Sequence, residues 1–169
     1  MHFYKKISMV ALASLTLASC TKLDEQLGST LERSQADSVI QVASLLKTAY
    51  DGLQLPYQDQ SNLWALQEMP SDEAVAPTRG GDWDDNGQWR SLKTHTWTAE
   101  HPIIGATFTN LLLLQYSATN VLNFRPSKQQ AAEARFLRAL SMFSVLDAFG
   151  QVPFREPGED LRQAPKVLA

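Results

Sequence analysis

AAEARFLRALSMFSVLDAFGQVPF, residues 131–154, is the segment around which the chain is organised. Its apolar residues recur every three or four positions, the spacing that places side chains along one face of a helix. That row is Ala132, Phe136, Ala139, Leu140, Phe143, Leu146 and Phe149, and a second row of Ala134, Leu137 and Val145 widens the stripe. A helix this apolar lies between other elements. We therefore expect a helix over 128–149 with Phe136 on its most buried face.

The sequence on either side of this segment predicts where the helix begins and ends. Ser127 is placed to cap it, Gly150 to close it, and Pro153 prevents continuation. A second apolar periodicity covers 103–124, interrupted by Gln115 and including Asn120, which we expect to be partly buried and to need partners. Only three residues separate the two predicted helices, so they should form an antiparallel hairpin.

A third amphipathic pattern lies upstream, and the rest of the chain is less regular. Ser34-x-x-Asp37 resembles a capping box, and apolar residues then recur at helical spacing to Asp51-Gly52. Residues 54–98 show no sustained period apart from a short helix expected at 62–67. We predict an all-α fold, mainly α with long irregular loops.

Two motifs within residues 131–154 carry a family resemblance. Ala132, Phe136 and Ala139 reproduce A-x3-F-x2-A, the second-helix half of a tetratricopeptide repeat. The longer string E-A-R-F-L-R-A-L-S-x-F-x-x-L-D-x-F-G-x-V-P-F resembles the signature of the SusD/RagB family. These are surface lipoproteins that capture glycans or peptides for an outer-membrane transporter. The resemblance implies SusD-like, tetratricopeptide-like helical hairpins, and family members are several hundred residues long, so we interpret the chain as the N-terminal part of a longer protein.

The N-terminus has the organisation of a bacterial lipoprotein signal. Lys5 and Lys6 precede an apolar stretch at 7–18, which is too short to span a membrane, and Leu17-Ala18-Ser19-Cys20 matches a lipobox. We predict a signal peptide at 1–19, lipidation of Cys20, a tether at 20–33 and a helical domain at 34–169. The alternative is an ordinary signal peptide with an incidental cysteine.

The charge balance limits the class of partner. Loss of 1–19 removes two lysines, leaving 13 basic and 18 acidic residues and a net charge of −5. A nucleic-acid binder needs a basic face, so we expect no nucleic-acid partner. Membrane attachment would come from lipid chains at Cys20.

The loop after residue 67 holds the candidate ligand-binding residues. Glu68-Met69-Pro70-Ser71-Asp72-Glu73 resembles the family's E-x-P-[ST]-D-E segment, and in SusD-like proteins the sequence just after it contributes to the glycan site. A sugar packs its C–H face on an indole, and its hydroxyls need amide, carboxylate or guanidinium partners. The side chains of these types are Arg79, Asp82, Trp83, Asn86 and Trp89. The alternative is that both tryptophans only pack against the domain.

The sequence contains only weak matches to the motifs of catalytic and metal sites. Asp82-x-Asp84-x-Asn86-Gly87 matches the first half of a calcium loop, but Lys93 occupies the twelfth position and an Asx-rich turn is the alternative. Asp72 and Glu73 are adjacent, which is poor geometry for a glycosidase pair, and capping or ion-pair roles fit better. His95 and His101 lack further nearby ligands for zinc. We expect no cofactor, metal or catalytic residue.

These observations lead to one main functional hypothesis and one alternative. The main hypothesis is a lipid-anchored protein on the outer-membrane surface that binds oligosaccharide or peptide nutrients and delivers them to a SusC-like TonB-dependent transporter. The alternative is a helical-repeat lipoprotein scaffold that binds a protein partner without a nutrient site.

Overall fold

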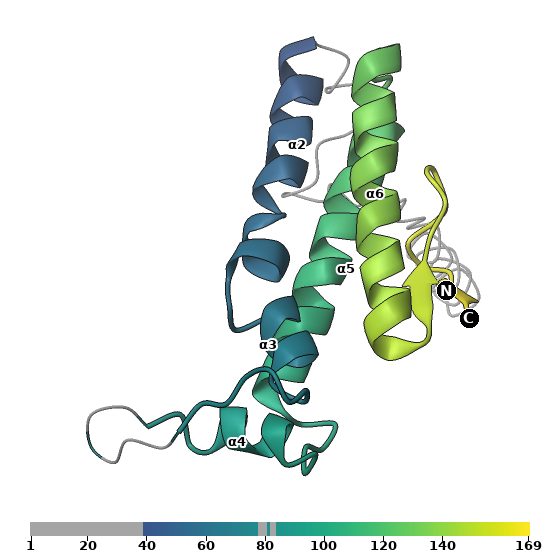
Figure 1. The fold of residues 1–169 in the computed structure, drawn as a ribbon. Coiled ribbons are helices and arrows are strands. Elements are labelled where there is room, and N and C mark those ends of the chain that lie inside the picture. Colours follow the sequence, from purple (N-terminus) through teal and green to yellow (C-terminus); the bar gives the residue numbers. More distant parts are fainter. Residues whose placement is uncertain (1–38, 78–80, 82–83) are drawn as a thin grey trace, which may run out of the picture. The chain divides into compact units, whose positions relative to one another are not determined.

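A long helical hairpin forms the centre of the fold. A computed structural model describes residues 39–77, 81 and 84–169, and in it α5 (Pro102–Asn123) and α6 (Lys128–Phe149) lie side by side in opposite directions (Figure 1). Ser127 caps α6: its side chain accepts a hydrogen bond from the Gln130 backbone N–H at 3.2 Å, and the Gln130 side chain accepts one from the Ser127 N–H at 2.9 Å. Gly150 closes α6 at φ +74°, a conformation that glycine adopts without steric cost. The predicted hairpin and both predicted α6 boundaries are confirmed.

Helix α2 (Val39–Asp51) packs against this hairpin and completes the main core. Small side chains from all three helices, Ala49, Ala118 and Ala134, are fully buried there. Small residues let helix axes approach closely, so larger neighbours can interlock around them. The larger buried members of this cluster are Val42, Leu46, Leu114, Val121, Phe124 and Leu137.

The face of α6 that is buried differs from the one that we expected. Phe136 and Phe143 are each 65% exposed, and Ala132 and Ala139 of the same row are exposed as well. The buried residues are Ala131, Ala134, Leu137, Ser141, Ser144 and Val145. The prediction that Phe136 lies on the most buried face is therefore wrong. The small side chains of the buried row allow α5 and α2 to approach, which the bulky phenylalanine row would prevent.

Residues 54–98 contain more regular structure than we expected. The segment η2 (Gln54–Gln58) is a short π-helix, and it is followed by α3 (Leu63–Glu68) and α4 (Gln88–Lys93). The short helix predicted at 62–67 is confirmed as α3. Helix α4 was missed because it lies in a stretch rich in glycine and acidic residues that shows no helical period. It is held by Leu92, which is buried with Ala65, Met69 and Ile103.

The chain ends in a small antiparallel ribbon that we did not predict. Strand β1 (Val152–Phe154) pairs with β2 (Lys166–Leu168), with Pro153 opposite Val167. Arg138 of α6 donates to the Arg155 carbonyl oxygen at 2.9 Å and pairs with Glu156 at 3.2 Å, which holds the segment after β1 against the helix. The described part of the chain is thus mostly helical with two short strands, in agreement with an all-α class.

Several sequence-based predictions lie outside the described residues. They are the signal peptide at 1–19, the lipidation site Cys20, the tether at 20–33, the capping box Ser34-x-x-Asp37 and the loop residues Arg79, Asp82 and Trp83. The described helices all belong to the unit Glu32–Ala169. None of them has the length and apolar character that crossing a membrane requires.

Candidate functional site

Asn86 and Trp89 are the candidate ligand-binding residues that the structure describes, and they lie at the start of α4. Asn86 is exposed with φ +54°, and Gly87 follows at φ +76°. Two consecutive left-handed residues make a tight turn, which Asn and Gly adopt most readily. This turn projects the Asn86 side chain to solvent and then starts the helix that carries Trp89.

The acidic residues of this turn serve local structure. Asp84 accepts a hydrogen bond from the Asn86 N–H at 2.9 Å, which is an Asx turn. Asp85 accepts from the N–H groups of Gly87 at 3.0 Å and Trp89 at 2.7 Å, so its carboxylate satisfies free donors at the N-terminus of α4. The Asx-turn interpretation therefore fits the described part of the calcium-like motif, and Lys93 at its twelfth position contacts Asp72 at 3.4 Å.

Trp89 forms a pair with a second tryptophan from another helix. Its ring centroid lies 6.1 Å from that of Trp64 on α3, with the planes tilted by 54°. Trp89 is half-buried against the cluster around Met69 and Leu92, whereas Trp64 is 47% exposed. We call these two residues the tryptophan pair. Trp89 supports the pair from the core side, and Trp64 presents an indole surface to solvent.

Trp64 was not predicted as a candidate ligand-binding residue, although its position on α3 carries a signal. Ala65 of α3 and Met69, which follows the helix, are four residues apart and both are buried. Trp64 precedes this buried row and lies off it, where a large aromatic side chain has little cover. An exposed indole is suited to stack on an apolar ring face or on the C–H face of a sugar.

The two histidines considered as weak zinc candidates have structural roles. His101 is buried, and its Nε2 lies 3.1 Å from the Gln88 carbonyl oxygen and 2.9 Å from Ser91 Oγ, linking α4 to the start of α5. His95 Nε2 lies 2.9 Å from the Pro70 carbonyl oxygen. A carbonyl oxygen only accepts, so each Nε2 carries a proton and is not free to bind a metal. Within residues 39–77 and 84–169 no three potential ligands gather at a metal site.

Comparison of the chain with protein-family models, with curated proteins and with solved structures finds no match.

Proposed function

We propose that this chain is a lipid-anchored protein of the outer-membrane surface that binds oligosaccharide or peptide nutrients. It would deliver them to a SusC-like TonB-dependent transporter and break no bond itself. The lipobox at Cys20 and the signature in α6, which resembles that of SusD-like proteins, support the compartment and the class. The single structural observation in favour of a ligand surface is the exposed Trp64 of the tryptophan pair.

The environment of Trp64 favours binding over packing. Its side chain is 47% exposed, and a tryptophan that only filled the core would be largely buried. The second ring of the pair lies partly in the core and fixes the first, so little side-chain freedom remains to be lost on stacking. A ring that is held in place and open to solvent is a suitable platform for a sugar or for an aromatic or proline residue of a peptide.

The proposal is tested by glycan-array retention of the full chain and of Trp64→Ala. We expect the variant to bind about tenfold or more weakly, the scale of losing an aromatic anchor, with little change in melting temperature. Trp97→Ala is the matched control, because Trp97 is also exposed, at 41%, and contacts His95 instead of a tryptophan. Equal retention of Trp64→Ala and the unmodified chain would remove the tryptophan pair from the ligand site. Release of new reducing ends from a bound glycan would show an enzyme instead.

We infer that α5 and α6 form a tetratricopeptide-like hairpin. Repeats of this kind stack, so each hairpin offers one face to the next. The outward row with Ala132, Phe136 and Ala139 has the small–large–small pattern of such a face, and it is exposed.

The same row favours a second candidate function, a scaffold that binds a protein partner. Phe136 and Phe143 lie two turns apart on α6 and are both 65% exposed, and aromatic side chains anchor many protein interfaces. If this function holds, the double variant Phe136→Ala/Phe143→Ala should no longer retain the SusC-like transporter as its protein partner, and the full chain should retain no glycan. Retention of glycan by that double variant at the unmodified level would support the nutrient-binding function.

A further inference from the structure

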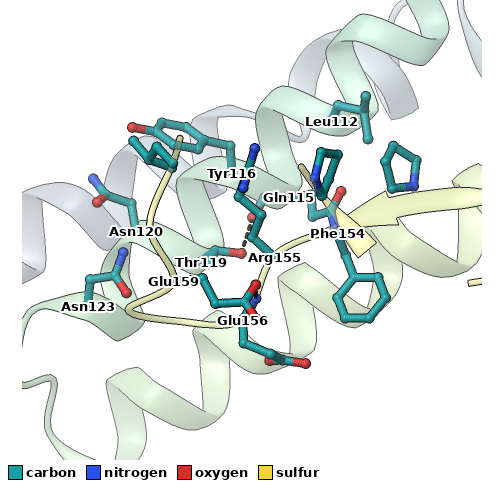
Figure 2. Close-up of a pocket in the computed structure, with 13 residues that line it drawn as sticks. Leu112, Gln115, Tyr116, Thr119, Asn120, Asn123, Phe154, Arg155, Glu156 and Glu159 are labelled. Carbon is teal, nitrogen blue, oxygen red and sulfur yellow. Dashed lines mark hydrogen bonds between the residues drawn. The ribbon is translucent and has the colours of Figure 1, made fainter. Parts of the chain in front are cut away.

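A cavity of about 270 Å³ lies between the C-terminal half of α5 and the segment that connects β1 to β2 (Figure 2). One wall is a single face of α5, because its members recur at intervals of three and four residues. They are Leu112, Gln115, Tyr116, Thr119, Asn120 and Asn123. The opposite wall is formed by residues of the 153–165 segment, among them Phe154, Arg155 and Glu156.

The polar side of the cavity contains side-chain amides that the protein leaves without partners. Gln115 is only 5% exposed, and among the described residues nothing hydrogen-bonds its amide; only its backbone carbonyl is used, accepting from Thr119 Oγ at 2.7 Å. Asn120 is half-buried, and its amide likewise has no partner in the described part of the chain. Asn120 was expected to need partners, and the structure places it in this wall. Both residues line the cavity, where a bound molecule can reach their amides, and side-chain amides that line a cavity without a protein partner point to a ligand.

The charged groups of the cavity are already compensated. Glu156 pairs with Arg138 at 3.2 Å, and Glu159 pairs with Lys166. The Arg155 guanidinium donates to the Asp160 carbonyl oxygen at 3.2 Å, and its charge adds to the hydrogen bond from Arg162 in lowering the pKa of the Asp160 carboxyl, so this neighbouring carboxylate offsets it. A charged ligand would lose its hydration on entering the cavity and would find no unpaired opposite charge to offset that cost. An uncharged ligand avoids this desolvation cost.

The remaining surface of the cavity is apolar and partly aromatic. Tyr116 on α5 and Phe154 on β1 both contribute to the lining, together with Leu112. The volume lies just below the range of about 300–1,000 Å³ typical of pockets for drug-sized molecules, so it suits one ring with its substituents. Amides beside aromatic rings are the combination that satisfies hydroxyl groups and covers a C–H face.

We propose that this cavity binds an uncharged polyhydroxy compound of the size of one sugar ring. Gln115 and Asn120 donate to and accept from its hydroxyl groups. The Asn123 Oδ1 accepts the Gly158 N–H at 2.7 Å, so Asn123 positions the covering segment and keeps its amide N–H₂ for the ligand. The site is separate from the tryptophan pair, which lies on α3 and α4, and it does not depend on the function proposed above.

The test is a ligand-observed NMR titration of the full chain. The uncharged probes are D-glucose, D-galactose and D-mannose; D-glucuronate and D-glucosamine are charged probes, and N-acetylglycinamide is an amide probe. We expect saturable binding of at least one uncharged hexose and weaker binding of the other three. Gln115→Leu should weaken hexose binding about tenfold, the cost of one or two lost hydrogen bonds. Its unfolding midpoint should stay the same or rise, because an unpaired buried amide is replaced by an apolar group of similar shape.

Control variants distinguish binding in this cavity from binding elsewhere on the chain. Gln129→Leu makes the same change at an exposed position of α6 and should leave hexose binding unchanged. Asn120→Ala provides a second test at a half-buried position if Gln115→Leu fails to fold. The proposal is overturned if no hexose binds saturably, if Gln115→Leu or Asn120→Ala binds hexose normally, or if a charged probe or the amide binds more tightly. A loss of hexose binding in Trp64→Ala would also overturn it, because the hexose would then bind at the tryptophan pair.

Discussion

Leu137 and Phe136 are neighbours in sequence, but Leu137 lies on the buried face of α6 and Phe136 on an exposed face, so truncating each to alanine tests the orientation of the helix. Leu137 is 1% exposed and contributes to the core with α2 and α5. Leu137→Ala removes three carbon atoms at about 0.8 kcal/mol each and leaves a cavity, for a total cost of about 2.7–5 kcal/mol. Phe136 is 65% exposed, so Phe136→Ala removes about a third of a burial worth about 1.5–3 kcal/mol. The better helix propensity of alanine offsets part of that loss.

The assay is urea unfolding of the full chain, monitored by circular dichroism. The two variants are compared on the condition that the slope of the free energy of unfolding against urea concentration is the same for both, so that a change in midpoint reports a change in stability. We expect Leu137→Ala to lower the free energy of unfolding by several kcal/mol and Phe136→Ala by less than about 1 kcal/mol. A larger loss for Phe136→Ala would refute the described orientation of α6 and restore the orientation that periodicity alone predicted. Equal small losses would mean that α6 does not belong to a tightly packed core.

Three further predictions concern a cap, the anchor and an ion pair. Ser127→Ala should cost about 0.5–2 kcal/mol in urea unfolding, because it removes the α6 cap, and Ser127→Asn should retain most of that stability. Cys20→Ala should abolish metabolic labelling with palmitate, and unchanged labelling would contradict the lipoprotein assignment. The hydrogen bond from Arg162 lowers the pKa of Asp160 from 3.8 to about 2. The stability that this pair contributes is therefore present above about pH 3.8 and is lost as the pH falls towards about 2. An NMR titration of the Asp160 carboxyl should show the low pKa, and Arg162→Ala should return it towards 3.8; an unshifted pKa in the unmodified chain would contradict the pairing.

The helical hairpin and its ends follow from the sequence alone. Ser127, Gly150 and the short connection between α5 and α6 act through hydrogen bonds and backbone angles within a few residues of each other. Such local physics can be recognised in a sequence without knowledge of the fold. The Asx turn at Asp84–Asn86 is open to the same reasoning, because its hydrogen bond joins residues two positions apart.

Which face of α6 is buried depends on tertiary packing. Both rows of the helix are apolar, so periodicity could not choose between Phe136 and Leu137. The choice depends on how closely α2 and α5 approach, and the small side chains Ala134 and Ser141 permit a contact that the phenylalanines would not.

The two proposed ligand surfaces likewise depend on long-range packing. Trp64 and Trp89 are brought together because α3 and α4 share a buried cluster, although the two residues are far apart in the sequence. Gln115 interrupts an apolar row in the sequence of α5. Its environment depends on the 153–165 segment, which is held by Arg138 and covers that face of α5. A sequence pattern specifies which faces a helix has, and the segments that fold onto those faces determine which becomes core, surface or cavity.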